Sequence, residues 1–271
     1  MLVAHLSDLH LGGCLHSCAG LLDKRLLGTA IFLFNRLLQH RSRWVGRALD
    51  RLQELQPDVV VITGDVTSLG TPREFRRAVD ILQPALRNMT VLYVPGNHDA
   101  YTADPACVQA LDAGFHALNQ QRWHRRELPV AFTTGQLEFI LVDQAAPTPW
   151  FCARGRLPEA AGPRLQQLLE TPAAGPRVLV SHYPLFNADG RPLPPRRASE
   201  THAGLLQAWR DGAIQVALCG HIHHPFVRTD ARGNQEVCAG SLTQHGRIDL
   251  LHYDPATRAF EQEWEQLEPA G

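Results

Sequence analysis

The chain has 271 residues, of which 44% are hydrophobic and 20% charged, and its formal net charge at pH 7 is −1. This composition is that of a globular protein and excludes an intrinsically disordered chain. A near-neutral charge also argues against a protein that wraps nucleic acid, so we expect no nucleic-acid partner. The length fits one large α/β domain, and we interpret residues 1–271 as a single domain.

Short apolar runs rich in Val, Ile and Leu alternate with longer segments of helical periodicity. The runs predict buried strands at Leu2–Ser7, Val59–Thr63, Thr90–Val94, Phe139–Val142, Arg177–Ser181 and Gln215–Cys219. The longer segments predict helices at 42–56, 72–86, 104–118, 158–170 and 200–210. Thr71 and Pro72 read as the N-cap and first residue of the second helix. This alternation predicts a largely parallel sheet covered by helices, with antiparallel strands after Pro225.

The sequence also indicates a cellular compartment. The first predicted strand begins directly after Met1 and leaves no room for a cleavable signal peptide. No apolar run reaches the roughly 20 residues that span a bilayer. The six cysteines form no Cys-x-x-Cys pair. Cys14 and Cys18 flank His16 and could in principle hold a metal, but reduced thiols are the simpler interpretation, and we expect a cytoplasmic protein.

One segment is longer than the fold requires. About 30 residues separate the first strand from the helix near residue 42, where strand-to-helix loops usually take about 2–6 residues. We interpret residues 12–41 as a helical insert. Residues 22–39 place most of their large apolar side chains on one half of a helical wheel, and six Lys or Arg residues stand against one acid within 11–47. Such a helix is typical of contact with an anionic membrane, and also of packing on its own domain.

A polar cluster follows each of five predicted strands. In chain order these are Asp8-Leu9-His10, Gly64-Asp65-Val66-Thr67, Gly96-Asn97-His98-Asp99, His182 and Gly220-His221-Ile222-His223. Functional loops of α/β sheets gather at the carboxyl ends of the strands. Carboxylates with imidazoles are typical ligands of Mn²⁺, Fe²⁺ or Zn²⁺. Each cluster alone is also an ordinary turn, but five in this order predict a metal centre.

The spacing within two clusters predicts how their side chains point. In an extended segment alternate residues share a face, so Asp8 with His10, and His221 with His223, would reach one site. Glycines 64, 96 and 220 would allow sharp turns and a close approach of the backbone to the metals.

With these motifs the sequence resembles the calcineurin-like metallophosphoesterases, whose pattern is D-x-H, G-D-x-x, G-N-H-D, a lone histidine and G-H-x-H. The resemblance runs from residue 5 to about residue 245. It implies an αββα sandwich, an α/β fold of two packed mixed β-sheets flanked by helices, with a two-metal site between the sheets. By position it assigns Asp8, His10 and His223 to the first metal, Asn97, His182 and His221 to the second, and Asp65 to both.

The resemblance further implies a dinuclear-metal-dependent phosphoesterase, with Mn²⁺ as the expected metal. Two such ions, about 3.5–4 Å apart, would clamp the phosphoryl oxygens and supply a bridging hydroxide as the nucleophile. His98 is then the acid that assists the leaving oxygen, and Asp99 orients it. A structural histidine beside the ligands is the alternative for His98.

Two shorter similarities concern the substrate. Gly64-Asp65-Val66-Thr67 with Gly70 and Glu74, Gly155-x-Leu157 and Ser181-His182-Tyr183-Pro184 resemble the subgroup that contains cyclic-nucleotide phosphodiesterases and lipid-pathway pyrophosphatases. Lys24-Arg25-x-x-Gly28 with Asn35-Arg36 resembles the insert of the calcineurin-type UDP-2,3-diacylglucosamine pyrophosphate hydrolases of lipid A biosynthesis. This implies a nucleotide-lipid substrate and peripheral contact with the inner membrane through residues 22–39.

Other substrates and roles stay open. A soluble cyclic-nucleotide or general phosphodiesterase needs the same metal core but no apolar basic helix. A non-catalytic scaffold on this fold is less favoured, because such scaffolds typically lose ligands. Loop arginines that could reach substrate phosphates, and that are otherwise simply solvated, are Arg154, Arg156, Arg191, Arg196 and Arg197.

Overall fold

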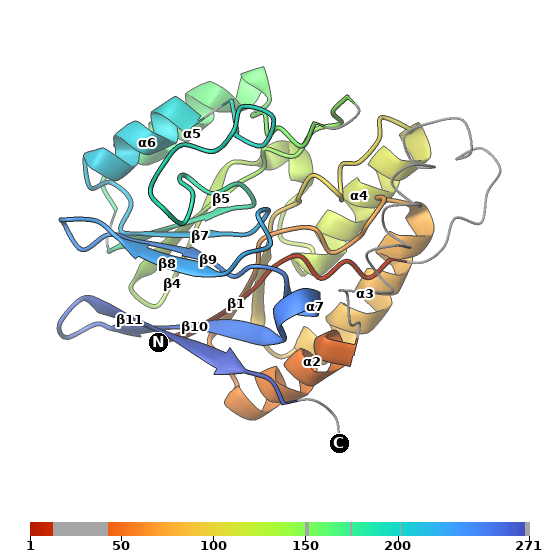
Figure 1. The fold of residues 1–271 in the computed structure, drawn as a ribbon, viewed down its shortest axis with the longest axis horizontal. Coiled ribbons are helices and arrows are strands. Elements are labelled where there is room, and N and C mark those ends of the chain that lie inside the picture. The colour runs from red at the N-terminus through yellow and green to blue at the C-terminus, as the bar shows by residue number, and fades with distance from the viewer. Residues whose placement is uncertain (13–42, 150–151, 174, 201, 269–271) are drawn as a thin grey trace.

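Two β-sheets pack face to face and are flanked by helices on both outer sides (Figure 1). The structure, a computed structural model, describes residues 1–12, 43–149, 152–173, 175–200 and 202–268. The first sheet is covered by α2 (Arg43–Leu55), α3 (Pro72–Leu86) and α4 (Pro105–Leu118), and the second by α5 (Gly162–Glu170) and α6 (His202–Arg210). This is the αββα sandwich expected from the sequence.

The first sheet has the strand order β11-β10-β1-β2-β3. Its strands are β1 (Leu2–Leu6), β2 (Val59–Ile62), β3 (Thr90–Tyr93), β10 (Arg247–Asp254) and β11 (Ala259–Gln266). The first three run parallel, while β10 pairs antiparallel with both β1 and β11. All four residues of β2 are buried because the strand is covered on both faces, which explains its unbroken run of Val and Ile.

The second sheet has the strand order β4-β5-β6-β7-β9-β8. Its strands are β4 (Val130–Thr134), β5 (Leu137–Val142), β6 (Arg177–Ser181), β7 (Val216–Cys219), β8 (Phe226–Thr229) and β9 (Gln235–Cys238). The four inner strands run parallel, and β4 and β8 close the two edges in the antiparallel direction. The two sheets are therefore both mixed, which corrects the expectation of one largely parallel sheet.

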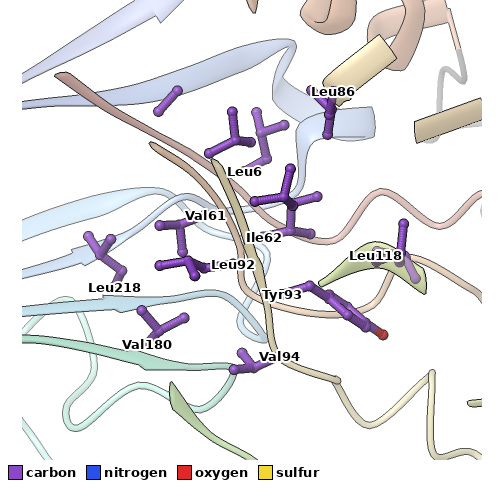
Figure 2. Close-up of a cluster of buried hydrophobic side chains, with 14 of the residues drawn as sticks. Leu6, Val61, Ile62, Leu86, Leu92, Tyr93, Val94, Leu118, Val180 and Leu218 are labelled. Atoms are coloured by element: carbon purple, nitrogen blue, oxygen red, sulfur yellow. The ribbon is translucent and has the colours of Figure 1, made fainter. Parts of the chain in front are cut away.

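The main core lies between the sheets and continues under the outer helices. Figure 2 shows Val61 of the first sheet close to Val180 and Leu218 of the second, whereas Ile62 points away from them, toward the side of Leu86. Successive residues of a strand face opposite sides, so adjacent positions of β2 serve both layers. The sandwich thus holds the ends of its inner strands at fixed positions.

The predicted strands are confirmed, with every boundary within two residues of the expectation. The N-cap of α3 is also confirmed: Thr71 Oγ1 accepts the backbone N–H of Glu74, and the Glu74 carboxylate accepts that of Thr71. The strand β4 was not expected, because its residues alternate between exposed and half-buried at a sheet edge. The helix expected at 158–170 begins only at Gly162, since Pro163 is best tolerated in a first turn.

Some expectations lie outside the described residues. They are the helical insert at 12–41 beyond its first residue, the amphipathic segment 22–39, and the segment Cys14–Cys18. The four cysteines that are described, Cys107, Cys152, Cys219 and Cys238, are free thiols. In the part of the chain that the structure describes, no helix combines the length and apolar character needed to cross a membrane.

Candidate metal centre

The loops after β1, β2 and β7 bring four of the expected metal ligands together. Asp8, His10, Asp65 and His223 each offer one ligand atom, and these four atoms lie within 4.8 Å of one another. Nε2 of His223 is 3.2 Å from Nε2 of His10 and 3.0 Å from Oδ1 of Asp8. The residues expected around the first metal therefore share one site.

The ligands expected around the second metal form an adjoining group. Oδ1 of Asn97 lies 3.1 Å from Nε2 of His182 and 2.8 Å from Nδ1 of His221. Oδ2 of Asp65 lies 3.5 Å from Nε2 of His182, which joins this group to the first. All seven expected ligands thus lie in one continuous cluster between the sheets.

The backbone at this cluster is unusual. Of the nine non-glycine residues with positive φ in the described chain, five are expected ligands: Asp8 (54°), His10 (47°), Asp65 (53°), His221 (71°) and His223 (59°). This left-handed region costs free energy for non-glycine residues, and such strain concentrates at functional sites. It also corrects the sequence argument, because the paired ligands are not in extended segments. Their side chains converge through left-handed turns instead.

Two glycines are required by close contacts. A Cβ on Gly96 would lie 2.1 Å from Oδ1 of Asp65, and a Cβ on Gly220 would lie 2.5 Å from Oδ2 of Asp8. Both distances are far below van der Waals contact, so any side chain there would displace a ligand carboxylate. The expected close approach of the backbone is thus present at both positions.

Two buried carboxylate oxygens indicate a cation. Oδ1 of Asp8 and Oδ2 of Asp65 are inaccessible to solvent, and neither accepts a well-aligned hydrogen bond from a described residue. Buried anionic oxygens without donors are unfavourable unless a positive charge neutralises them. Both oxygens face imidazole nitrogens of the cluster. This donor set of carboxylate, amide and imidazole groups fits divalent ions.

The electrostatics of the cluster point the same way. Burial raises the pKa of Asp65 well above its usual range, and the nearby carboxylates of Asp8 and Asp99 add to the rise. Burial also raises the pKa of Asp8, but the surrounding histidines, His223 foremost, outweigh it and hold the pKa below its usual range. Burial lowers the pKa of His221 well below its usual value. A neutral imidazole is the form that binds a metal.

His98 lies at the edge of the cluster, and a backbone carbonyl holds its ring. Its Nδ1 lies 2.7 Å from the carbonyl oxygen of Ser68, and its ring packs edge-on against His10, with 5.0 Å between centroids. When Nδ1–H donates to this carbonyl, the other ring nitrogen, Nε2, points away from Ser68. His98 is thus placed for either role considered above.

Asp99 stabilises the loop around His98. Its carboxylate accepts the hydroxyl hydrogen bond of Tyr93 at 2.8 Å and the backbone N–H groups of Gly96 and Thr67 at 3.0 and 2.9 Å. Ser68 thus holds the ring of His98, and Asp99 ties the loop that carries His98 to the loop of Thr67.

The five candidate arginines lie on exposed loops, and three have acidic partners. Arg154 and Arg156 lie 2.9 and 3.6 Å from Glu200, and Arg191 lies 3.7 Å from Asp189. The backbone carbonyl of Arg197 accepts a hydrogen bond from Nε2 of His221 at 3.1 Å. Arg196 is its neighbour in the same loop.

Several groups that hold the ligands were not predicted. The carbonyl of Thr63 lies 2.6 Å from Nδ1 of His182, and the amide of Gln244 lies 3.1 Å from Nδ1 of His223. The buried His5 in turn bridges Thr63 Oγ1 at 2.8 Å and Asp249 at 3.0 Å. A sequence does not show which backbone carbonyls take part in such contacts. His5 and Asp249, however, are polar residues inside buried strands, and this indicates a hydrogen-bond network.

The sequence comparison decides the family. A family model described as "Calcineurin-like phosphoesterase" matches residues 1–225. The chain belongs to this family. All seven expected ligands lie within the matched range.

Two curated relatives of this calcineurin-like phosphoesterase are phosphodiesterases. This chain is 28% identical over 225 residues to the glycerophosphodiester phosphodiesterase GpdQ of Enterobacter lignolyticus. The match covers 83% of this chain and 71% of the relative. This chain is 26% identical over 230 residues to the cAMP/cGMP dual specificity phosphodiesterase MT0825 of Mycobacterium tuberculosis, covering 81% and 61%. The chain thus spans less than two thirds of the second relative.

Solved structures share the fold at low sequence identity. A dimetal phosphatase from Danio rerio superimposes with a TM-score of 0.62 at 14% identity, covering 93% of this chain and 92% of that one. A purple acid phosphatase from yellow lupin gives a TM-score of 0.62 at 12% identity, covering 98% and 51%. The chain is therefore a metal-dependent phosphoester hydrolase by family, and these solved structures share its fold.

Proposed function

We propose that the protein is a two-metal phosphodiesterase. The observation that carries this proposal is the cluster of expected ligands around two buried carboxylate oxygens, Asp8 Oδ1 and Asp65 Oδ2, that face imidazole nitrogens. Asp8, His10 and His223 would hold one divalent ion and Asn97, His182 and His221 the other, with Asp65 between them. The printed activities of the two curated relatives support a diester as the substrate.

The chain's own residues would supply the rest of the chemistry. Two divalent ions lower the pKa of bound water toward neutrality and stabilise charge on phosphoryl oxygens. The carbonyl of Ser68 holds Nδ1 of His98, so that Nε2 can donate a proton to the leaving oxygen. Asp99 keeps the loop of His98 against the loop of Asp65 through Thr67. Mn²⁺ is the proposed metal, and Fe²⁺ and Zn²⁺ suit the same donor set.

A second candidate function is a UDP-2,3-diacylglucosamine-type lipid pyrophosphate hydrolase of lipid A biosynthesis. The observation that favours it is the apolar and basic pattern of residues 22–39, which is typical of a helix at an anionic membrane. The enzyme would then work peripherally at the cytoplasmic face of the inner membrane. The alternative is a soluble cyclic-nucleotide or general phosphodiesterase, which needs no such helix.

A substrate panel tests the proposal. The purified protein is stripped with EDTA, reloaded with Mn²⁺, Fe²⁺ or Zn²⁺, and assayed on bis-p-nitrophenyl phosphate, a glycerophosphodiester, cyclic AMP and UDP-diacylglucosamine. We expect metal-dependent hydrolysis of the first substrate and binding of two metal equivalents. A metal-loaded, folded protein that hydrolyses none of the four would make the scaffold interpretation the better one.

A further inference from the structure

We infer that Arg196 and Arg197, on a loop platform beside the metal centre, bind a second phosphate group of the substrate. The arginine platform comprises residues 152–156 and 194–200. This inference rests on the proposed function, because it concerns the substrate of the same site.

The two segments of the platform hold each other through their backbones. The N–H of Ala153 donates to the carbonyl of Arg196 at 2.9 Å, and the N–H of Glu200 donates to the carbonyl of Gly155 at 2.9 Å. Gly155 and Ser199 form a parallel bridge. Backbone hydrogen bonds in both directions restrict the loops, so their side chains start from a defined position.

Buried side chains fasten the platform to the end of β6. The amide of Gln144 donates to Ser199 Oγ at 2.7 Å, and its carbonyl accepts the hydroxyl of Ser181 at 2.6 Å. All three side chains are buried, and Ser181 directly precedes the ligand His182. The platform and this metal ligand therefore share one support.

The platform also packs on the metal centre through an aromatic ring. A Cβ on Gly155 would lie 2.7 Å from the ring of Tyr183, so the platform backbone lies against that ring. The other ring contacts of Tyr183 are His221 at 4.7 Å and His182 at 5.2 Å between centroids. Only glycine permits this approach, which brings the platform next to the second group of ligands.

Arg197 is joined directly to a ligand. Its carbonyl accepts Nε2–H of His221 at 3.1 Å, and Nδ1 of the same ring lies 2.8 Å from Asn97. The backbone of Arg197 therefore lies directly against the second group of expected ligands.

The charges on the platform are not balanced. Its residues include four arginines and one acid, in a chain whose net charge is −1. Glu200 pairs with Arg154 and Arg156. Arg196 and Arg197 are exposed, and across the described ranges neither guanidinium group lies within salt-bridge distance of a carboxylate. Two cations thus stay available for an anionic ligand.

A second phosphate is the ligand that fits. The single negative charge of a simple diester would be neutralised at the two metals, so it needs no further cations. Guanidinium groups bind phosphate oxygens in a bidentate manner, which suits a second phosphate next to the reacting one. The substrate class is therefore a phosphodiester with a nearby second phosphate, either as a pyrophosphate or as a phosphomonoester elsewhere on the molecule.

The experiment compares substrates that share a leaving group. Thymidine 5′-p-nitrophenyl phosphate is the reference substrate. Its 3′-phosphate and the p-nitrophenyl ester of thymidine 5′-diphosphate carry the second phosphate, and all three are assayed with the Mn²⁺-loaded protein. The second phosphate should raise kcat/KM about 10-fold or more, mainly through KM, since a charge-assisted hydrogen bond contributes a factor of about 10–100. The arm that gains more, 3′-phosphate or pyrophosphate, identifies the source of the second phosphate.

Charge-removing variants test the residues. Arg196→Gln with Arg197→Gln should reduce the preference for the second phosphate at least about 10-fold, and the matched variant Arg210→Gln, at an exposed position of α6, should retain the wild-type preference. A wild-type protein that hydrolyses bis-p-nitrophenyl phosphate but gains nothing from either second phosphate overturns the inference. So does a double variant with undiminished preference. Absence of any metal-dependent hydrolysis by the wild type would instead contradict the proposed function.

Discussion

Oδ1 of Asp65 accepts the backbone N–H of His98 at 2.8 Å, while Oδ2 of the same carboxylate lies 3.5 Å from Nε2 of His182. One oxygen thus holds the loop that carries His98, and the other faces the ligands. An amide in place of this carboxylate keeps the volume and can still accept the N–H, but it cannot neutralise two cations. The amide substitution should therefore weaken metal binding much more than it affects folding.

We predict that Asp65→Asn lowers Mn²⁺-dependent hydrolysis of bis-p-nitrophenyl phosphate more than about 100-fold, since loss of outer-shell groups alone costs about 10–100-fold. The metal-free melting temperature should stay near that of the wild type, because the burial that raises the pKa of Asp65 disfavours its charge. Elemental analysis checks the metal content. Asp50→Asn on the exposed side of α2 is the control, and near-normal turnover of Asp65→Asn would remove Asp65 from the site.

His98→Ala should retain both metals, because none of the expected ligand atoms belongs to this residue. Its rate should fall by about 10²–10⁴-fold on diesters with poor leaving groups, and much less on p-nitrophenyl esters, whose leaving group needs little protonation. Rates on an alkyl and a nitrophenyl diester, measured on the same preparation, check this. Equal losses on both, or loss of metal, would assign His98 a structural role.

We predict that the buried carboxyl group of Glu236, which lies outside the metal centre, makes the stability of the folded protein depend on pH. Burial raises its pKa from 4.5 to about 7, although the backbone N–H groups of Leu185 and Phe186 and the nearby Arg228 oppose the rise. The folded protein thus binds this proton more tightly than the unfolded chain. Its contribution to stability is complete below pH 4.5 and is lost as the pH rises through about 7.

Glu236→Gln retains an acceptor for the two N–H groups and carries no charge. We expect it to be about 1–3 kcal/mol more stable than the wild type at pH 8 and about equal to it near pH 4. Urea unfolding at several pH values measures the difference. Glu261→Gln, on an exposed position of β11, should follow the wild type throughout. A constant difference between Glu236→Gln and the wild type across this range would refute the assignment.

The double substitution Phe34→Asp with Leu38→Asp tests the insert. Its sequence pattern is typical of a helix that contacts a membrane and also of one that packs on its own domain. If the apolar half contacts acyl chains, both charges should abolish liposome binding and hydrolysis of a diacylated UDP-sugar while hydrolysis of bis-p-nitrophenyl phosphate continues. If it packs on the domain, two unpaired buried charges cost several kcal/mol, and melting temperature and all activities fall together. Gln39→Asn, on the polar half of the wheel, is the control.

The sequence motifs predicted which residues form the site, but not the backbone geometry that brings them together. Apolar runs predicted the inner strands because buried parallel strands need continuous Val, Ile and Leu, and the polar residues after them marked the loops. The left-handed turns at Asp8 and His221 were not predictable, since neither residue type requires that conformation. Likewise β4 was missed, because an edge strand with one exposed face carries little apolar signal.

Contacts between residues that are far apart in the sequence were the other feature that the sequence could not predict. The role of Ser68 depends on a backbone carbonyl that is 30 residues from His98 in the chain. Pairing of Arg154 and Arg156 with Glu200 depends on two loops that meet only in the fold. Sequence patterns describe neighbours along the chain, so the sorting of the five arginines needed the structure.

The position of β1 has a consequence for biosynthesis. This strand lies between β2 and β10 in the first sheet, and Leu2 pairs with His252. The sheet that carries Asp8 and His10 therefore stays incomplete until β10 has left the ribosome. Domains usually fold as units during synthesis, and pairing over such a distance is slow. Under the proposed function, a nascent chain that displays Asp8 and His10 would load no metal until the loop that carries His221 and His223 has also been translated.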